Sequence, residues 1–237
     1  MRLVITRPQA DSERTAAALR AHGHDVLLAP LMRVEMLPAD LMGDWSAVIV
    51  TSANAPAAIA GNPVRDVLVT LPLYAVGRRS AEAAQAAGFA RVTSADGDVG
   101  DLVKLIGEHR ANAKGPLLYL AGENRAADLI TALAARGIAA EMRVVYRAVA
   151  APYPPALIAA LRDGSVDGVL HYSKRSAENY LAGARAAGIT AAALTVRHFC
   201  LSAQIAAPLA DAGAAHISTA PHASEAALIE LLTPSPG

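Results

Sequence analysis

Short aliphatic and β-branched runs alternate with longer alanine-rich segments along almost the whole chain. The short runs are apolar at successive positions, as in strands that are buried on both faces of a parallel sheet. The longer segments have the composition of helices. The pattern therefore predicts an α/β protein with parallel sheets. We predict ten strands, at residues 3–6, 25–29, 47–51, 73–76, 91–94, 117–121, 141–145, 168–172, 196–201 and 216–218.

Two extended segments, residues 32–38 and 146–155, interrupt this alternation. Each alternates apolar and polar residues and then reaches proline, which disfavours helix in the residue before it. If both segments cross between domains, the middle of the chain is inserted into the rest. We therefore predict a discontinuous domain of residues 1–36 plus 150–237 and an inserted domain of residues 37–149. Each domain then holds five of the ten predicted strands.

Internal similarity favours two related domains. Residues 76–81 followed by Gly88 have the same spacing as residues 201–206 followed by Gly213. Residues 48–52 resemble residues 169–173, and residues 145–147 resemble residues 31–33. The residues that commonly end strands and begin helices in any α/β protein would produce the same likeness, so the alternative that the two domains are unrelated stays open.

Composition and charge narrow the possible partners and location. The 21 basic and 21 acidic side chains balance, and no Lys/Arg-rich run occurs, so we expect no nucleic-acid partner. The single Cys200 cannot form an internal disulfide and fits a reducing compartment. The start of the chain lacks the apolar region of a signal peptide, and no stretch is long enough to span a membrane. We expect a cytoplasmic protein without membrane contact.

The ends of the predicted strands carry the candidate chemistry, because parallel sheets bind ligands at the carboxyl ends of their strands. Hydroxyls, amides, glycines and basic side chains recur there, whereas Glu123 is nearly the only carboxylate. Such an edge suits a polyanionic ligand. Alternatively, the Ser, Thr and Asn residues are ordinary helix caps and the basic residues are simply solvated.

Other kinds of site lack their signals. None of the seven histidines forms a His-x-x-x-His pair, so we expect no metal. Cys200 lies inside a predicted strand, where a buried inert thiol is the simpler interpretation. The phosphate loop, the dinucleotide-binding Gly-x-Gly-x-x-Gly and the Gly-x-Ser-x-Gly of triad hydrolases are all absent.

A series of short motifs resembles uroporphyrinogen-III synthases over essentially the full chain. The motifs are residues 5–8 (ITRP), 50–55 (VTSANA), 75–77 (AVG), 118–122 (LYLAG) with Arg125, Leu133 to Gly137, 145–147 (VYR), and Tyr172 and Ser173 with Ser176. Each motif is unspecific alone, and their order and spacing carry the likeness. The resemblance implies two similar parallel-sheet α/β domains, a two-stranded connector and an active-site cleft between the domains.

The resemblance also implies the reaction. That family converts the linear tetrapyrrole hydroxymethylbilane to uroporphyrinogen III, with loss of water and inversion of the terminal D ring, in the biosynthesis of haem and related tetrapyrroles. The departing hydroxyl leaves an azafulvene, the terminal ring attacks it, and a spiro intermediate fragments and recloses. The resemblance implies no cofactor. We expect a monomer, with transient hand-over of substrate from hydroxymethylbilane synthase.

Site residues are carried over from the resemblance onto matching positions. Tyr146 matches the tyrosine expected to bind or protonate the departing hydroxyl, although a hinge tyrosine that only packs is an open alternative. The strand-end positions matched to substrate carboxylates, together with Arg7, Ser202 and Gln204 from the same edges, give the predicted substrate-binding set. This set is Arg7, Thr51, Ser52, Ala53, Asn54, Gly77, Ser80, Gly122, Arg125, Ser173, Lys174, Ser176, Ser202 and Gln204.

One departure from the family pattern leaves a rival open. Where the family has Gly-x-x-Thr after a late strand, this chain has Ser202 at the glycine and Ile205 at the threonine. Loss of the glycine would hinder a close backbone approach to a carboxylate, and Gln204 would be a replacement donor. The alternatives are a tetrapyrrole-binding or regulatory homologue without turnover, a two-domain solute-binding protein, which the missing signal peptide disfavours, and an unrelated nucleotide enzyme.

Overall fold

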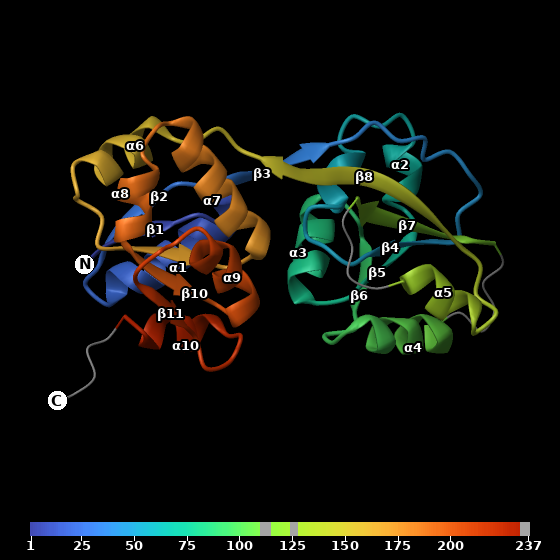
Figure 1. Ribbon diagram of the computed structural model, residues 1–237. Coiled ribbons are helices and arrows are strands. Elements are labelled where there is room, and N and C mark those ends of the chain that lie inside the picture. The colour runs from blue at the N-terminus through green and yellow to red at the C-terminus, as the bar shows by residue number, and fades with distance from the viewer. Residues whose placement is uncertain (110–114, 124–127, 233–237) are drawn as a thin grey trace. The chain divides into compact units, whose positions relative to one another are not determined.

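The computed structural model describes residues 1–109, 115–123 and 128–232 (Figure 1). The chain divides into two compact units. Unit 1 is Met1–Arg33 with Val149–Gly237, and unit 2 is Val34–Ala148. Each unit is built around a largely parallel sheet with helices, so the predicted α/β class is confirmed.

Unit 1 contains a five-stranded sheet in the order β11-β10-β9-β1-β2. Every neighbouring pair is parallel, so all five strands end at the same edge. The strands are β1 (Arg2–Ile5), β2 (Asp25–Leu28), β9 (Gly168–His171), β10 (Arg197–Cys200) and β11 (Ile217–Thr219).

Helices cover both faces of this sheet, because alternate strand residues point to opposite sides. Leu3 and Ile5 of β1 pack with α1 (Gln9–Ala21) and α10 (Glu225–Glu230). Val4, between them, packs in the core of the other face. That face is covered by α6 (Pro155–Arg162), α7 (Lys174–Ala186), α8 (Thr190–Thr195) and α9 (Ala203–Asp211).

Unit 2 contains a six-stranded sheet in the order β3-β8-β7-β4-β5-β6. The strands from β8 to β6 are parallel. They are β3 (Met32–Met36), β4 (Ala47–Val50), β5 (Pro72–Ala75), β6 (Arg91–Ser94), β7 (Leu117–Gly122) and β8 (Ala140–Ala150).

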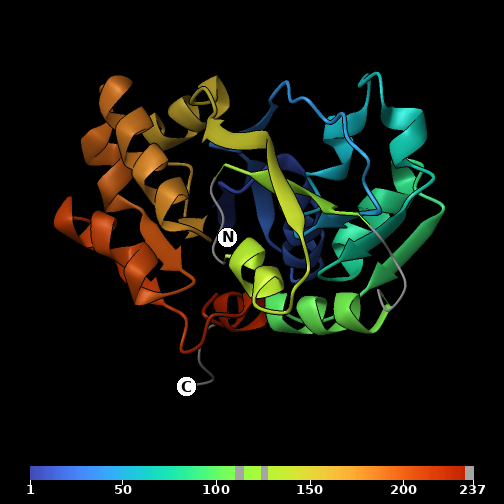
Figure 2. The same cartoon turned by 90° about the vertical axis from the view of Figure 1, so that its right-hand side faces the viewer.

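Two sets of helices cover the sheet of unit 2. Val48 and Leu120 face a core built with the 3₁₀ helix η1 (Pro56–Ile59), α2 (Arg65–Leu68) and α3 (Arg78–Ala86), which we call the α3 face. Ile49 and Tyr119 face the opposite core, where α4 (Val99–His109) and α5 (Leu129–Ala134) lie together (Figure 2). The helix α5 begins at Leu129, after Asp128, whose side chain accepts from the Thr131 N–H.

All ten predicted strands are present, and the two connectors add an eleventh. Residues 32–36, extended in the sequence pattern, form β3, and β8 continues to Ala150 beside it, so the connector is two-stranded, as the resemblance implied (Figure 1). The Leu37 N–H donates to the Val145 carbonyl (2.9 Å), and the Ala151 N–H donates to the Leu31 carbonyl (3.0 Å). From the first bond to the second, the residue number falls in one connector and rises in the other, so the two connectors pair in antiparallel fashion.

The predicted internal similarity is confirmed by the topology. Strand order β11-β10-β9-β1-β2 in unit 1 corresponds to β6-β5-β4-β7-β8 in unit 2. After β10 and β5, a residue with extended backbone precedes a nine-residue helix, Ser202 before α9 and Gly77 before α3. Left-handed glycines follow both helices, Gly213 with φ 87° and Gly88 with φ 104°.

Candidate active site

The strand ends of unit 2 bring the predicted residues Thr51, Gly77 and Gly122 to one edge of its sheet. Thr51 follows β4, Gly77 lies just after β5, and Gly122 ends β7. Since β7, β4 and β5 are parallel neighbours, these positions lie along adjacent strand ends.

The turn that follows β4 is fixed by its own polar groups. The Thr51 hydroxyl pairs with the buried Tyr119 hydroxyl at 2.8 Å. The Ser52 hydroxyl accepts from the Asn54 N–H at 3.2 Å, and the Ser52 carbonyl accepts from the Ala55 N–H. Thr51, Ser52 and Ala53 are half-buried and Asn54 is exposed, so a ligand can reach this turn.

Gly77 leaves space at the start of α3. Its backbone is extended, with φ −153° and ψ 170°, and a Cβ built on it would meet no atom within 4 Å. The Gly77 carbonyl accepts from the Ser80 N–H, and no side chain caps the helix. Ser80, in the first turn of α3, is only 5% exposed. The accessible groups of this helix start are therefore its backbone and the exposed side chains of Arg78 and Arg79.

A β-bulge turns Tyr146 to the α3 face of unit 2. Ala121 pairs with Val144, but Gly122 pairs with Tyr146, so one extra residue lies on β8. Because strand side chains alternate, Tyr146 without this residue would share the opposite face with Met142. Instead, Tyr146 packs against the α3-face core together with Val145.

The ring of Tyr146 lies on Gly122 at the carboxyl end of β7. A Cβ on Gly122 would stand 2.5 Å from Cζ and 2.7 Å from the hydroxyl oxygen of Tyr146. The Glu123 N–H donates to the Tyr146 carbonyl at 2.9 Å, which joins the two strands beyond the bulge. The phenol of Tyr146 is thus placed at the same sheet edge as Thr51 and Gly77.

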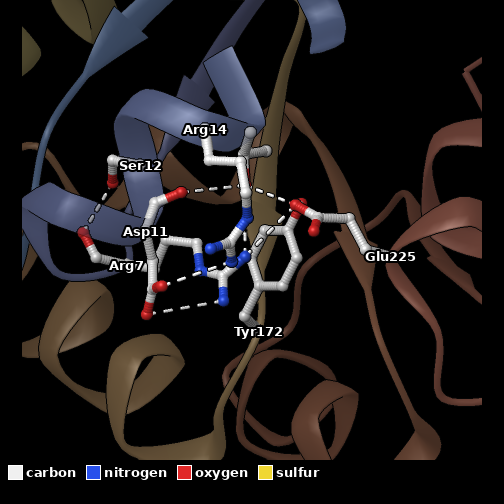
Figure 3. A network of polar contacts seen from close by, with 7 residues as sticks. Arg7, Asp11, Ser12, Arg14, Tyr172 and Glu225 are labelled. Carbon is white, nitrogen blue, oxygen red and sulfur yellow. Dashed lines mark hydrogen bonds and ion pairs between the residues drawn. The ribbon is translucent and has the colours of Figure 1, made fainter. Parts of the chain in front are cut away.

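In unit 1, Arg7 lies in a network of polar side chains that ties several elements together. Figure 3 shows its guanidinium over the ring of Tyr172, between Asp11 and Glu225. Arg7 contacts Glu225 Oε1 at 3.2 Å, Asp11 Oδ2 at 3.6 Å and Thr15 Oγ1 at 3.1 Å. Glu225 also accepts from the Thr15 hydroxyl and, at 3.4 Å, from the Tyr172 hydroxyl.

Burial, reinforced by the charge of Glu225, raises the pKa of Tyr172, so its hydroxyl remains a donor. The Arg7 side chain is only 17% exposed. Two carboxylates already surround the guanidinium of Arg7, so its predicted role in substrate binding competes with these internal partners.

A second group of hydroxyls holds the end of β1 to β9 and α7. The buried Thr6 hydroxyl donates to the Leu170 carbonyl at 3.0 Å and accepts from the Ser176 hydroxyl at 2.8 Å. Ser176 is 2% exposed, and its N–H donates to the Ser173 hydroxyl, which caps α7. Ser176, predicted to bind substrate, therefore lies inside the unit, whereas Ser173 and Lys174 are exposed.

The start of α9 differs from the start of α3 in its first residue. Ser202 makes no side-chain cap, and its carbonyl accepts from the N–H groups of Ile205 and Ala206. Ser202 is half-buried and Gln204 is exposed. Ile205, at the position where the resemblance expects a threonine, is 8% exposed and packs in the core of unit 1.

The comparisons with known proteins agree with this architecture. A family model described as uroporphyrinogen-III synthase HemD matches residues 13–230, which is most of the chain. The chain belongs to the uroporphyrinogen-III synthase family. Cyclisation in tetrapyrrole biosynthesis is therefore its enzymatic function, and a tetrapyrrole is the substrate class.

A solved structure of a uroporphyrinogen-III synthase shares the fold of this chain. The enzyme from Helicobacter pylori aligns with TM-score 0.60 and 18% identity, over 98% of each chain. A mutant enzyme from Thermus thermophilus covers 98% of this chain and 97% of its own, with 18% identity and TM-score 0.49. The comparison with curated protein sequences gives no match.

Several features of this uroporphyrinogen-III synthase were not predicted from its sequence. The β-bulge beneath Tyr146 has no local residue signal, because it depends on how two distant strands pair. Tyr119 could have been found as the residue with a polar hydroxyl in an otherwise apolar strand. Glu225 gave no such signal, because acidic residues are common in the first turn of a helix. Arg125 of the predicted set lies outside the described residues.

The contact between two buried histidines was not predicted from the sequence either. His171 Nε2 lies 3.2 Å from His198 Nδ1, and both side chains are fully buried. Burial lowers the pKa of His171 well below that of a free imidazole, and it lowers the pKa of His198 to about 4. Both rings are therefore neutral at pH 7.

Cys200 is fully buried beside this pair, as predicted, and burial raises its thiol pKa to about 12. Among residues 1–109, 115–123 and 128–232, no group of three or more His, Cys, Asp or Glu side chains is arranged to hold a metal ion. Within the same ranges, no helix is both long and apolar enough to cross a membrane.

Proposed function

We propose that Tyr146 is the catalytic acid of the cyclisation, and that the strand-end turns of each unit hold the substrate carboxylates. The observation that carries this proposal is the position of the Tyr146 phenol, turned by the bulge onto Gly122 at the carboxyl edge of unit 2. Ligands of open parallel sheets bind at this edge.

The reaction requires one proton donor and close control of the substrate's geometry. Hydroxymethylbilane must lose its hydroxyl as water to give an azafulvene, and a phenol can donate the proton that makes water a good leaving group. The terminal ring must then attack through the position that gives inversion. Holding a flexible chain in that geometry is mainly a task for binding contacts.

The strand-end turns supply contacts suited to the eight carboxylates of the substrate. In unit 2 these are the turn of Thr51, Ser52, Ala53 and Asn54 and the bare backbone of Gly77 at the start of α3. In unit 1 the accessible groups are Ser173, Lys174, Ser202 and Gln204 at the starts of α7 and α9. Hydroxyls, a lysine and helix-start N–H groups bind carboxylates well.

The proposal includes no cofactor, because proton donation and positioning account for the steps that the residues can perform. It places the enzyme in the cytoplasm as a monomer that receives substrate by transient contact with hydroxymethylbilane synthase. The buried free thiol of Cys200 is in keeping with a reducing compartment. Size-exclusion chromatography with light scattering would detect a dimer and so contradict the monomer.

The first test supplies freshly generated hydroxymethylbilane to the purified protein and separates the oxidised products by isomer. We expect an excess of the type III isomer over the type I isomer, which forms spontaneously when the chain closes without inversion. Tyr146→Phe should then lower kcat by about 10²–10⁴-fold, the usual contribution of a positioned acid. Tyr153→Phe is the matched control, because the buried Tyr153 hydroxyl makes no hydrogen bond in the described structure.

Two outcomes would contradict parts of this proposal. Type I alone, at the rate without enzyme, would leave a tetrapyrrole-binding homologue without turnover, the alternative that the burial of Ile205 and the side chain of Ser202 favour. Type III formation at an unchanged rate by Tyr146→Phe would keep the activity and reduce Tyr146 to a packing residue.

A further inference from the structure

Gly122 and Tyr146 interlock at the end of β7 in a way that only a glycine permits. The ring atoms Cζ and Cε2 of Tyr146 lie 2.5 and 2.8 Å from where a Cβ of Gly122 would be. Real Cβ atoms do not approach other atoms so closely, and Gly122 is itself buried. The tyrosine ring therefore occupies the volume that any other residue would fill.

The backbone of Gly122 gives no other reason for glycine at this position. Its φ is not among the positive values of the described chain, which include those of Gly88 and Gly137. Gly122 continues a strand whose other residues are ordinary L-amino acids. The requirement is for space above the Cα, and Tyr146 uses that space.

The bulge and the glycine act together on one side chain. The extra residue of β8 turns Tyr146 toward the α3 face, and Gly122 then receives its ring. The Glu123 N–H to Tyr146 carbonyl bond fixes the tyrosine backbone on the far side of the bulge. Rotation of the ring away from this seat would move the hydroxyl along the sheet edge.

We propose that Gly122 is a positioning residue for the reaction: its missing side chain seats the Tyr146 ring and so sets where the phenolic hydroxyl donates its proton. This inference rests on the proposed role of Tyr146. It assigns Gly122 an action through another residue, in place of the direct contact with substrate expected from the sequence. A displacement of about 1 Å in a catalytic group can cost on the order of 100-fold in rate.

The test combines Gly122→Ala with Tyr146→Phe and measures kcat and KM for formation of the type III isomer. In the wild-type background, Gly122→Ala should lower kcat by on the order of 100-fold with little change in KM. In the Tyr146→Phe background, where no hydroxyl remains to be displaced, the same change should lower kcat by less than about threefold, the non-additivity expected of groups acting as one unit.

A matched control separates positioning from loss of stability. Gly168, which begins β9 at the opposite edge of unit 1, would place a Cβ 2.6 Å from Cε2 of Phe199. Gly168→Ala therefore introduces a similar clash with an aromatic ring, but at the amino end of a strand and not at a carboxyl end. Both Gly168→Ala and Gly122→Ala should lower the thermal midpoint of unfolding, but Gly168→Ala should leave kcat unchanged at a temperature where both variants remain folded.

A rescue experiment identifies the clash directly. In a Tyr146→Ala background the seat is empty, so Gly122→Ala should no longer lower the thermal midpoint. Equal kcat losses for Gly122→Ala in the wild-type and Tyr146→Phe backgrounds would overturn the proposal, as would a normal kcat in Gly122→Ala. If Tyr146→Phe itself leaves kcat unchanged, the catalytic role of Tyr146 fails, which is a different result from failure of the seat.

Discussion

The two units share one strand order but differ in the residues at the carboxyl ends of the equivalent strands β1 and β7. The pairing of β1 and β7 with their neighbours makes Thr6 and Arg7 of unit 1 equivalent to Leu120 and Ala121 of unit 2. In unit 1 these side chains are polar and engaged with Leu170, Ser176, Asp11 and Glu225. In unit 2 they are small or apolar, and Gly122 follows them.

The difference shows that a polar side chain at a strand end is not by itself evidence of a ligand. Unit 1 uses Arg7, Thr6 and Ser176 to fasten α1, α7 and α10 to its sheet. Unit 2 fastens its edge mainly through backbone bonds and one hydroxyl pair, Thr51 with Tyr119. The accessible groups in both units are the helix starts, where the functional proposal places the carboxylates.

The largest expected effect concerns the buried histidines of unit 1. At the positions equivalent to His171 and His198, unit 2 has Val50 and Leu73. Because folding lowers both histidine pKa values, the folded state binds fewer protons than the unfolded state below pH 6.5. The contribution of the two neutral histidines to the free energy of unfolding is complete above that pH. It is lost as the pH falls from 6.5 through 4, by ~3 kcal/mol for His198 alone.

Urea denaturation between pH 4 and 8 measures this acid sensitivity. The double variant His171→Val with His198→Leu, which grafts the residues of unit 2, should flatten the decline in the free energy of unfolding toward acid. His222→Gln removes an exposed histidine and should leave the decline as in the wild type. An equally steep decline in the double variant would show that carboxylates elsewhere dominate the acid response.

The next effect tests whether the hydroxyls at the end of β1 are structural. Thr6→Val keeps the shape of the side chain but leaves the Leu170 carbonyl and the Ser176 hydroxyl without this partner. Loss of a buried hydrogen-bond partner costs about 1–3 kcal/mol in free energy of unfolding. Chemical denaturation measures it, and Thr195→Ala, at an exposed threonine, is the control. No loss in Thr6→Val would mean that the cluster relaxes without cost.

A third prediction exchanges the helix starts of the two units. Gly77→Ser gives unit 2 the residue that unit 1 has at Ser202, and Ser202→Gly does the reverse. A Cβ on Gly77 meets no protein atom within 4 Å, so the change should be harmless to stability. If a substrate carboxylate approaches the backbone there, KM should rise by about tenfold, which corresponds to losing roughly one hydrogen bond.

The same kinetic assay measures KM for Ser202→Gly. This variant should have a lower KM if the serine side chain obstructs the approach of a substrate carboxylate to α9. Unchanged KM in both variants would remove these helix starts from the binding proposal. Rising KM in Gly77→Ser with no change in Ser202→Gly would restrict backbone binding to unit 2.

Strand positions were predictable because each depends on a local run of apolar residues, such as residues 168–172 and 197–200. From the residue pattern alone the connectors were predicted only as extended, and their two-stranded character was implied by the family resemblance, since the pairing depends on a hydrogen bond between Leu37 and Val145, far apart in the chain. The candidate site could be proposed from the sequence as a set of strand ends. Which of its side chains are engaged internally, as Arg7 and Ser176 are, depends on packing that no local pattern contains.

The smallest effect decides how Arg7 should be classified. Glu225→Gln keeps an acceptor for Thr15 and Tyr172 but removes the charge that Arg7 pairs with at 3.2 Å. Because about a third of the Glu225 side chain is exposed, solvent screens this pair, and its loss should cost at most about 1 kcal/mol in free energy of unfolding.

KM separates the two roles of Arg7 more sharply than stability does. If Arg7 only fastens α10 to the sheet, Glu225→Gln leaves KM unchanged. If Arg7 also binds a substrate carboxylate, removal of the competing internal carboxylate lowers KM, because the guanidinium no longer has to exchange partners. We expect the unchanged value, since Asp11 still lies 3.6 Å from Arg7 and Tyr172 still covers one face of the guanidinium. A lower KM would return Arg7 to the substrate-binding set and show that unit 1, like unit 2, leaves a side chain at its edge for the ligand.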